Sequence, residues 1–242
     1  MYHKIYKKVL KFNQTSRPFI NSPIIEFFIN RLSNFFVPFF IILNVRPNTI
    51  TIINFFLGLI SIFFILFDER LFTYGIILFF LTILIDNIDG GVARYTKKTF
   101  FGKFIDSLSD AVIYSLFYFS IALNFFILNY NLLVFCLGII SCFFILIEIL
   151  ILDKFSSLVR WCNQENKLNN LPYIRKKYYL RFFLIIRDLI LLLTLLLIFL
   201  KNEVFNFYII IITINCLWLI SSLSNIVLHL YYGKKYLDFV KK

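Results

Sequence analysis

Apolar residues along this chain form long runs that short polar segments interrupt. A helix that crosses a membrane needs roughly 20 predominantly apolar residues. Runs of this kind cover residues 47–67, 71–94, 100–128, 131–152, 181–200 and 205–231. The pattern therefore predicts an all-α, polytopic membrane protein with six transmembrane helices.

The chain before the first run has a different pattern. Residues 22–44 are apolar, but Glu26, Arg31 and Pro38 interrupt them, which favours an interfacial amphipathic helix over a further crossing. Residues 1–21 carry lysines among aromatic residues, as is typical of a segment on an anionic membrane surface. We therefore divide the chain into a cytoplasmic, interfacial N-terminal segment (1–46), a six-helix membrane domain (47–232) and a basic cytoplasmic tail (233–242).

Composition supports the membrane assignment and gives an orientation. The chain is 60% hydrophobic with a mean hydropathy of +0.84, which excludes an ordinary soluble domain. Its net charge of +12 does not indicate a nucleic-acid partner, because 22 of the 25 Lys and Arg residues lie in segments 1–46, 94–103, 153–182 and 233–242. The positive-inside rule places these segments and both termini in the cytoplasm. Abundant Phe, Ile, Asn and Lys indicate an AT-rich bacterial genome, and hence a bacterial cell membrane.

Four aspartates flank the connection between the second and third runs. Asp86 and Asp89 are three residues apart, and Asp106 and Asp110 are four apart, so each pair projects from one helix face. One ionised Asp at the centre of a membrane helix costs about 2.5–3.5 kcal/mol, so four require a common partner. Carboxylate oxygens are the ligands of hard cations, and the pattern predicts one or two Mg²⁺ or Mn²⁺ ions near one membrane surface.

The residues around the acids indicate a phosphate ligand. Gly90, Gly91 and Ala93 remove side-chain bulk beside the acids, so a ligand or a second helix can approach the backbone. Arg94 supplies a planar fork of donors that matches a phosphate group.

These residues resemble the signature of a known family, the CDP-alcohol phosphotransferases. The signature has the order Asp, two residues, Asp-Gly, two residues, Ala-Arg, seven or eight residues, Gly, three residues, Asp, three residues, Asp. A chance match has a probability on the order of 10⁻¹⁰ per start position. All of its fixed positions are present here, as Asp86, Asp89, Gly90, Ala93, Arg94, Gly102, Asp106 and Asp110.

The resemblance implies an enzyme of phospholipid biosynthesis. Such an enzyme transfers a substituted phosphoryl group, here expected to be phosphatidyl from CDP-diacylglycerol, to the hydroxyl of an alcohol acceptor and releases CMP. The resemblance also implies a six-helix fold, a cavity open to the cytoplasm, two metal ions and a homodimer.

It further implies a role for each matching residue. Asp86, Asp89 and Asp106 would ligate metal, and Asp110 would be the general base and contact the second ion, although spacing alone does not distinguish Asp110 from Asp106 as the base. The cytidine diphosphate site would be lined by Gly90, Ala93, Arg94 and Gly102. A Pro-Asn-x-x-Thr element often precedes the signature in this family, and Pro47, Asn48 and Thr51 match it. Asn48 and Thr51 are therefore predicted to contact CDP, with a plain helix start at Pro47 as the alternative.

The acceptor is less defined. Lys103, Glu148 and Arg187 are possible acceptor-pocket residues, because ionisable residues inside spans are functional candidates. Alternatively, Glu148 pairs with Arg187, or Arg187 extends to the interface. The motif wording fits neither the phosphatidylserine-synthase nor the glycerophosphate branch cleanly, so another CDP-alcohol donor or an inositol-phosphate-type acceptor stays open. The alternative from another class is a divalent-cation transporter, but transport sites are expected near the bilayer midplane.

Overall fold

Eight helices make up the described part of the chain in a computed structural model. The structure describes residues 2–16, 24–67, 70–96, 99–165, 177–200 and 203–240. In chain order the helices are α1 (Tyr2–Ser16), α2 (Ile24–Ile42), α3 (Pro47–Phe67), α4 (Phe72–Tyr95), α5 (Phe100–Asn129), α6 (Leu132–Glu165), α7 (Lys177–Leu200) and α8 (Val204–Val240).

Five of these helices are long and apolar enough to cross a membrane. They span Pro47–Phe67, Phe72–Tyr95, Phe100–Asn129, Leu132–Phe155 and Val204–Tyr231. They match five of the six predicted spans. The other predicted span, 181–200, falls in α7, where several side chains lie outside the described residues, so a crossing by α7 stays a prediction.

Two regions differ from the pattern-based expectation. The segment before residue 46 forms two packed helices instead of one, and the hydroxyl of Tyr2 on α1 donates to the backbone oxygen of Phe35 on α2 at 2.6 Å. Helix α6 also continues beyond the predicted end at 152 as far as Glu165, because no glycine or proline interrupts the chain between Gly138 and Pro172.

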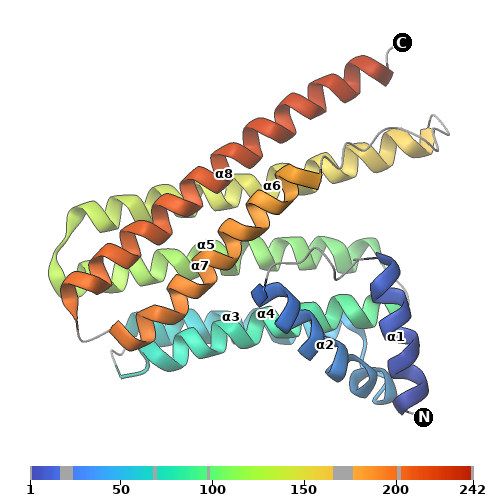
Figure 1. The fold of residues 1–242 in the computed structure, drawn as a ribbon, viewed down its shortest axis with the longest axis horizontal. Helices are drawn as coiled ribbons and strands as arrows, with labels where there is room; N and C mark the ends of the chain where they lie inside the picture. Colours follow the sequence, from blue (N-terminus) through green and yellow to red (C-terminus); the bar gives the residue numbers. More distant parts are fainter. Residues whose placement is uncertain are drawn as a thin grey trace.

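The helices form one bundle in which α3, α4, α5 and α6 run roughly along the long axis, whereas α7 and α8 are inclined to it (Figure 1). The C-terminal end of α4, the N-terminal end of α5, α1 and the C-terminal end of α8 lie at the same end of the bundle (right in Figure 1). We call this the α4–α5 end. Helix α4 contacts α3, α2 and α7, so the segment that carries Asp86 and Asp89 is supported from several sides.

Large side chains fill the centre of the bundle. The rings of Phe79 on α4 and Phe117 on α5 stack with centroids 3.5 Å apart, and Tyr118 packs against Trp218 on α8. A second, smaller cluster at the α4–α5 end joins α1, α2, α3 and α4, and it contains Ile5, Val9, Val37, Ile50, Ile88 and Val92. The first cluster holds the spans together, and the second packs the N-terminal helices against the acidic segment of α4.

Small and polar residues join the helices where their backbones approach. The Ser61 hydroxyl on α3 donates to the backbone oxygen of Gly75 on α4 at 2.7 Å, and the Asn124 amide on α5 donates to the oxygen of Ile65 at 2.8 Å. A Cβ at Gly75 would lie 2.9 Å from the Ser61 backbone oxygen and 2.7 Å from the Ile65 side chain. Gly75 therefore sets how closely α3 and α4 pack, as small residues do between membrane helices.

Gly75→Ala is expected to lower the free energy of unfolding by about 1–3 kcal/mol, because the added methyl group meets backbone that cannot move aside without separating α3 from α4. Unfolding in detergent measures this change. Ile77→Ala, on the exposed face of the same helix, serves as the control and is expected to change stability by less than about 0.5 kcal/mol. Equal stability of Gly75→Ala and the wild type would contradict the packing role of Gly75.

Candidate active site

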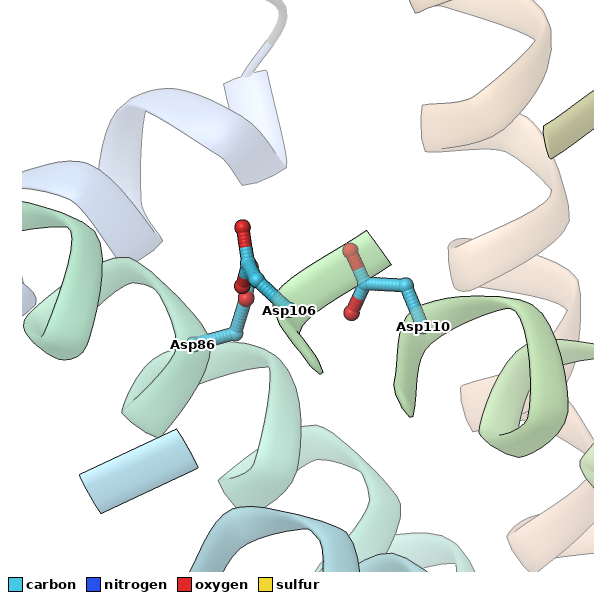
Figure 2. Close-up of side chains that lie close together, drawn as sticks. All are labelled: Asp86, Asp106 and Asp110. Carbon is cyan, nitrogen blue, oxygen red and sulfur yellow. The ribbon is translucent and has the colours of Figure 1, made fainter. Parts of the chain in front are cut away.

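Three carboxylates meet at the α4–α5 end. Asp86 lies on α4, and Asp106 and Asp110 lie one turn apart on α5. One carboxylate oxygen from each lies within 4.8 Å of the others, and all three residues are partly buried. Figure 2 shows the side chain of Asp86 reaching from its helix toward those of Asp106 and Asp110. The predicted meeting of the two acidic segments is thus confirmed for three of the four aspartates.

The local sequence explains how α5 presents its two acids. Thr99 has an extended backbone, and its hydroxyl oxygen accepts a hydrogen bond from the Gly102 N–H at 3.0 Å, so α5 begins just before the acidic segment. From this start, Asp106 and Asp110 are separated by one helical turn and share a face. The helix start therefore sets the rotation at which both carboxylates turn toward α4.

The three acids form a donor set suited to a hard divalent cation. Three like-charged carboxylates this close together in a membrane-embedded bundle repel one another and need a neutralising partner. Their ligand atoms are all oxygens, which Mg²⁺ and Mn²⁺ prefer, and their spacing lets one ion touch all three. The residues present therefore fit the predicted metal.

Asp89, the fourth aspartate, has a different environment. It is only 4% exposed, and its carboxylate accepts a hydrogen bond from the Thr51 hydroxyl of α3 at 2.7 Å. Thr51 also donates to the backbone oxygen of Pro47 at 3.2 Å, which links the acid to the start of α3. A direct role of Asp89 in metal binding stays a prediction.

Asn48 and Gly102, both predicted CDP-binding residues, lie against each other. A Cβ at Gly102 would lie 2.5 Å from the Asn48 side-chain oxygen and 2.8 Å from the Thr99 hydroxyl. Glycine at 102 therefore allows the start of α3 to approach the start of α5 beside the acids. Helix α3 begins at Pro47, as predicted from the helix-start pattern.

The two adjacent glycines on α4 have different surroundings. A Cβ at Gly91 would overlap Val37 of α2 at 2.5 Å, so Gly91 lets α2 pack against α4. A Cβ at Gly90 would meet only the Arg94 guanidinium, at 3.3 Å. Gly90 and Arg94 thus lie on the same helix face as Asp86, one and two turns beyond it. Ala93, next to Arg94 in the chain, is partly exposed. Gly90 is a better candidate than Gly91 for ligand approach.

The predicted acceptor residues lie on three different helices. Arg187 of α7 is exposed and close enough to Asp110 for its charge to act on that carboxylate, and Lys103 is exposed near the start of α5. The Glu148 carboxylate of α6 is buried and accepts hydrogen bonds from Ser222 at 2.5 Å and Asn225 at 2.6 Å, both on α8. These bonds give Glu148 a role in joining α6 to α8.

Two polar residues have structural roles that the sequence pattern did not indicate. The Asp188 carboxylate on α7 accepts from the Ile25 backbone N–H at 3.0 Å and so caps the start of α2. Asn54 on α3 lines a pocket together with Asp86 and Asp110. The signal for Asn54 was its position one turn after Thr51 in an otherwise apolar run.

Fold and site together define a helical membrane protein with an oxygen-ligand site for a divalent cation at one end of its bundle. The family model of the CDP-alcohol phosphatidyltransferases matches residues 44–227, and the chain belongs to this family. No curated protein matches the chain. Membership makes the protein a metal-dependent membrane CDP-alcohol phosphotransferase of lipid biosynthesis, which decides against the cation-transporter alternative.

Substitutions at the two neighbouring glycines are expected to separate fold from function. Gly91→Val should lower the unfolding midpoint, because the new side chain overlaps Val37 and displaces α2. Gly90→Val should leave the midpoint unchanged but weaken binding of CDP-diacylglycerol by roughly ten-fold or more, since its side chain displaces Arg94 from the predicted phosphate site.

Thermal unfolding and titration with CDP-diacylglycerol in detergent measure the two effects for each variant. Wild-type CDP-lipid affinity in Gly90→Val would contradict the assignment of Gly90 to the nucleotide site. An unchanged midpoint in Gly91→Val would contradict its packing role.

Proposed function

We propose that this enzyme transfers the phosphatidyl group of CDP-diacylglycerol to the hydroxyl of a small alcohol and releases CMP. The observation that carries the proposal is the grouping of Asp86, Asp106 and Asp110 within 4.8 Å, one turn from Gly90 and two turns from Arg94 on α4. This grouping places oxygen ligands for a metal ion near the guanidinium of Arg94, which suits a phosphate. Binding of a donor that carries a pyrophosphate requires both groups.

In the proposed reaction the acceptor oxygen forms a bond to the phosphorus of the phosphatidyl group. The bond between that phosphorus and the oxygen of CMP breaks, and CMP leaves with the bonding electron pair. Asp110 takes the proton of the acceptor hydroxyl as general base. Arg94 neutralises a phosphate oxygen of the donor, and Gly90, Ala93, Gly102, Asn48 and Thr51 line the CDP site. A divalent ion held by Asp86, Asp89, Asp106 and Asp110 would stabilise the charge that develops on the phosphates.

Asp110 is favoured over Asp106 as the base by its neighbours. Asp110 is the member of the group that lines the polar pocket between α3, α4 and α5 together with Asp86. Asp106 does not line that pocket. A base must reach both the acceptor and the reacting phosphate, and Asp110 borders both spaces.

The remaining assignments follow from charge distribution and family resemblance. The α4–α5 end faces the cytoplasm of a bacterial cell, with both termini on the same side, because the positive-inside rule assigns the Lys- and Arg-rich segments 1–46, 94–103, 153–182 and 233–242 to the cytoplasm. The enzyme acts as a homodimer in the membrane. Lys103 and Arg187 lie near the entrance that the acceptor uses.

The first prediction concerns the reaction itself. The purified protein is expected to release CMP from CDP-diacylglycerol only when Mg²⁺ or Mn²⁺ and a suitable alcohol are both present. A panel of glycerol 3-phosphate, L-serine, ethanolamine, choline, inositol, inositol phosphate and a lipid alcohol identifies the acceptor. Asp106→Asn is the blank, because it removes one oxygen ligand from the three-acid group. No release with any acceptor would overturn CDP-diacylglycerol as the donor.

The second prediction separates the base from the ligands. Asp110→Asn is expected to lower kcat at least roughly 100-fold, the usual contribution of a general base, while CDP-diacylglycerol binding stays within a few-fold of the wild type. Turnover and binding are measured on the same preparation. Asp106→Asn is the matched comparison and should lose Mn²⁺ affinity as well. Near-normal turnover in Asp110→Asn would remove Asp110 from the base role.

A further inference from the structure

A polar pocket extends from the acids toward the interior of the bundle. It is lined by residues of α3, α4 and α5, namely Asn54, Phe55, Thr82, Ile83, Asp86, Ser109, Asp110, Ile113 and Tyr114. Thr82 precedes Asp86 by one turn on a helix that runs toward the α4–α5 end, and Tyr114 follows Asp110 by one turn on a helix that runs away from it. The pocket, which we call the Asn54 pocket, therefore lies deeper in the membrane than the three-acid group.

Asn54 contributes to the pocket a buried side-chain oxygen that lacks a hydrogen-bond donor. Its side chain is 9% exposed, and its Oδ1 atom has no hydrogen-bond partner among the described residues. Buried carbonyl oxygens in folded proteins are almost always hydrogen-bonded, since leaving one unpaired is unfavourable. An occupant that donates a hydrogen bond to Asn54 removes this penalty.

Several other polar atoms of the pocket can also accept a hydrogen bond. The Thr82 hydroxyl donates to the Phe79 backbone oxygen at 2.7 Å, and the Ser109 hydroxyl donates to the Asp106 backbone oxygen at 2.9 Å. Their hydrogens are used, while their oxygens can still accept. With the carboxylates of Asp86 and Asp110 and the Asn54 Oδ1, acceptor groups outnumber the two donor groups, the Asn54 amide and the Tyr114 hydroxyl, and the lining contains no lysine or arginine. A phosphate group does not fit such a lining, whereas a hydroxyl group does.

The space limits the occupant to about the size of one water molecule. A whole polyol is too large, but one hydroxyl group or one water is not. Because Asp110 belongs both to the lining of this pocket and to the three-acid group, an acceptor whose reacting hydroxyl donates to Asp110 can place a second donor group in the pocket.

We infer that the Asn54 pocket receives a hydrogen-bond donor of the acceptor alcohol other than its reacting hydroxyl, with Asn54 Oδ1 accepting this hydrogen bond, while the reacting hydroxyl donates to Asp110. The inference rests on the proposed function and adds a specificity-determining residue to it. A phosphorylated acceptor keeps its phosphate outside the pocket, whose lining contains no lysine or arginine.

The test uses the full-length protein with Asn54→Leu, which keeps the side-chain size and removes the acceptor oxygen. The donor is CDP-diacylglycerol, and the acceptor is the alcohol that supports the fastest CMP release by the wild type. Asn54→Leu is expected to lower kcat/KM for the acceptor roughly ten-fold, the effect of one hydrogen bond, mainly through KM, while the KM for CDP-diacylglycerol stays within about two-fold. Thr82→Val, an isosteric change on the opposite wall, is expected to act in the same direction.

Asn124→Leu is the matched control, because Asn124 is an equally buried asparagine that bonds to the Ile65 backbone oxygen outside the pocket. It is expected to leave the acceptor KM unchanged. An Asn54→Leu enzyme with wild-type acceptor kinetics and a raised unfolding midpoint would overturn the inference, because the pocket would then be empty. A fall in kcat at constant acceptor KM would also overturn it and assign the pocket to a fixed water. Absence of CMP release by the wild type overturns the proposed function instead.

Discussion

The constraint on which the rest of this structure depends is the burial of several carboxylates in a bundle that faces lipid. Charged groups away from water are stable only when they are paired, hydrogen-bonded or bound to a cation. The chain meets this requirement differently at each position. Asp86, Asp106 and Asp110 lie close enough together to share one cation, and Asp89 is bonded to Thr51.

Two other acids are stabilised by neutral donors. Glu148 accepts from Ser222 and Asn225, which ties α6 to α8. Asp188 accepts from the Ile25 N–H at the start of α2, where the helix dipole also favours a negative charge. Each of these bonds joins helices far apart in the sequence. The same acids that are unfavourable in a membrane thus determine how the helices assemble.

The site combines a rigid support with open space. Gly91 admits Val37, and Gly102 admits Asn48, so α2 and α3 pack closely against the two acidic segments. Gly90 has only Arg94 near its missing side chain. Close packing at Gly91 and Gly102 keeps the carboxylates in position, as preorganised catalytic groups require. The helix face at Gly90 stays open for a ligand.

The amino-acid sequence by itself determined the helical membrane class, the start of α3 at Pro47 and the family, because hydrophobic run length, proline geometry and motif spacing are local properties. It also indicated that the two acidic segments meet. Only the tertiary structure decided that Asp89 is buried and bonded to Thr51, because this contact depends on how α3 packs on α4. The same holds for Glu148, whose partners lie more than 70 residues away, and for Asn54, whose pocket forms only where three helices converge.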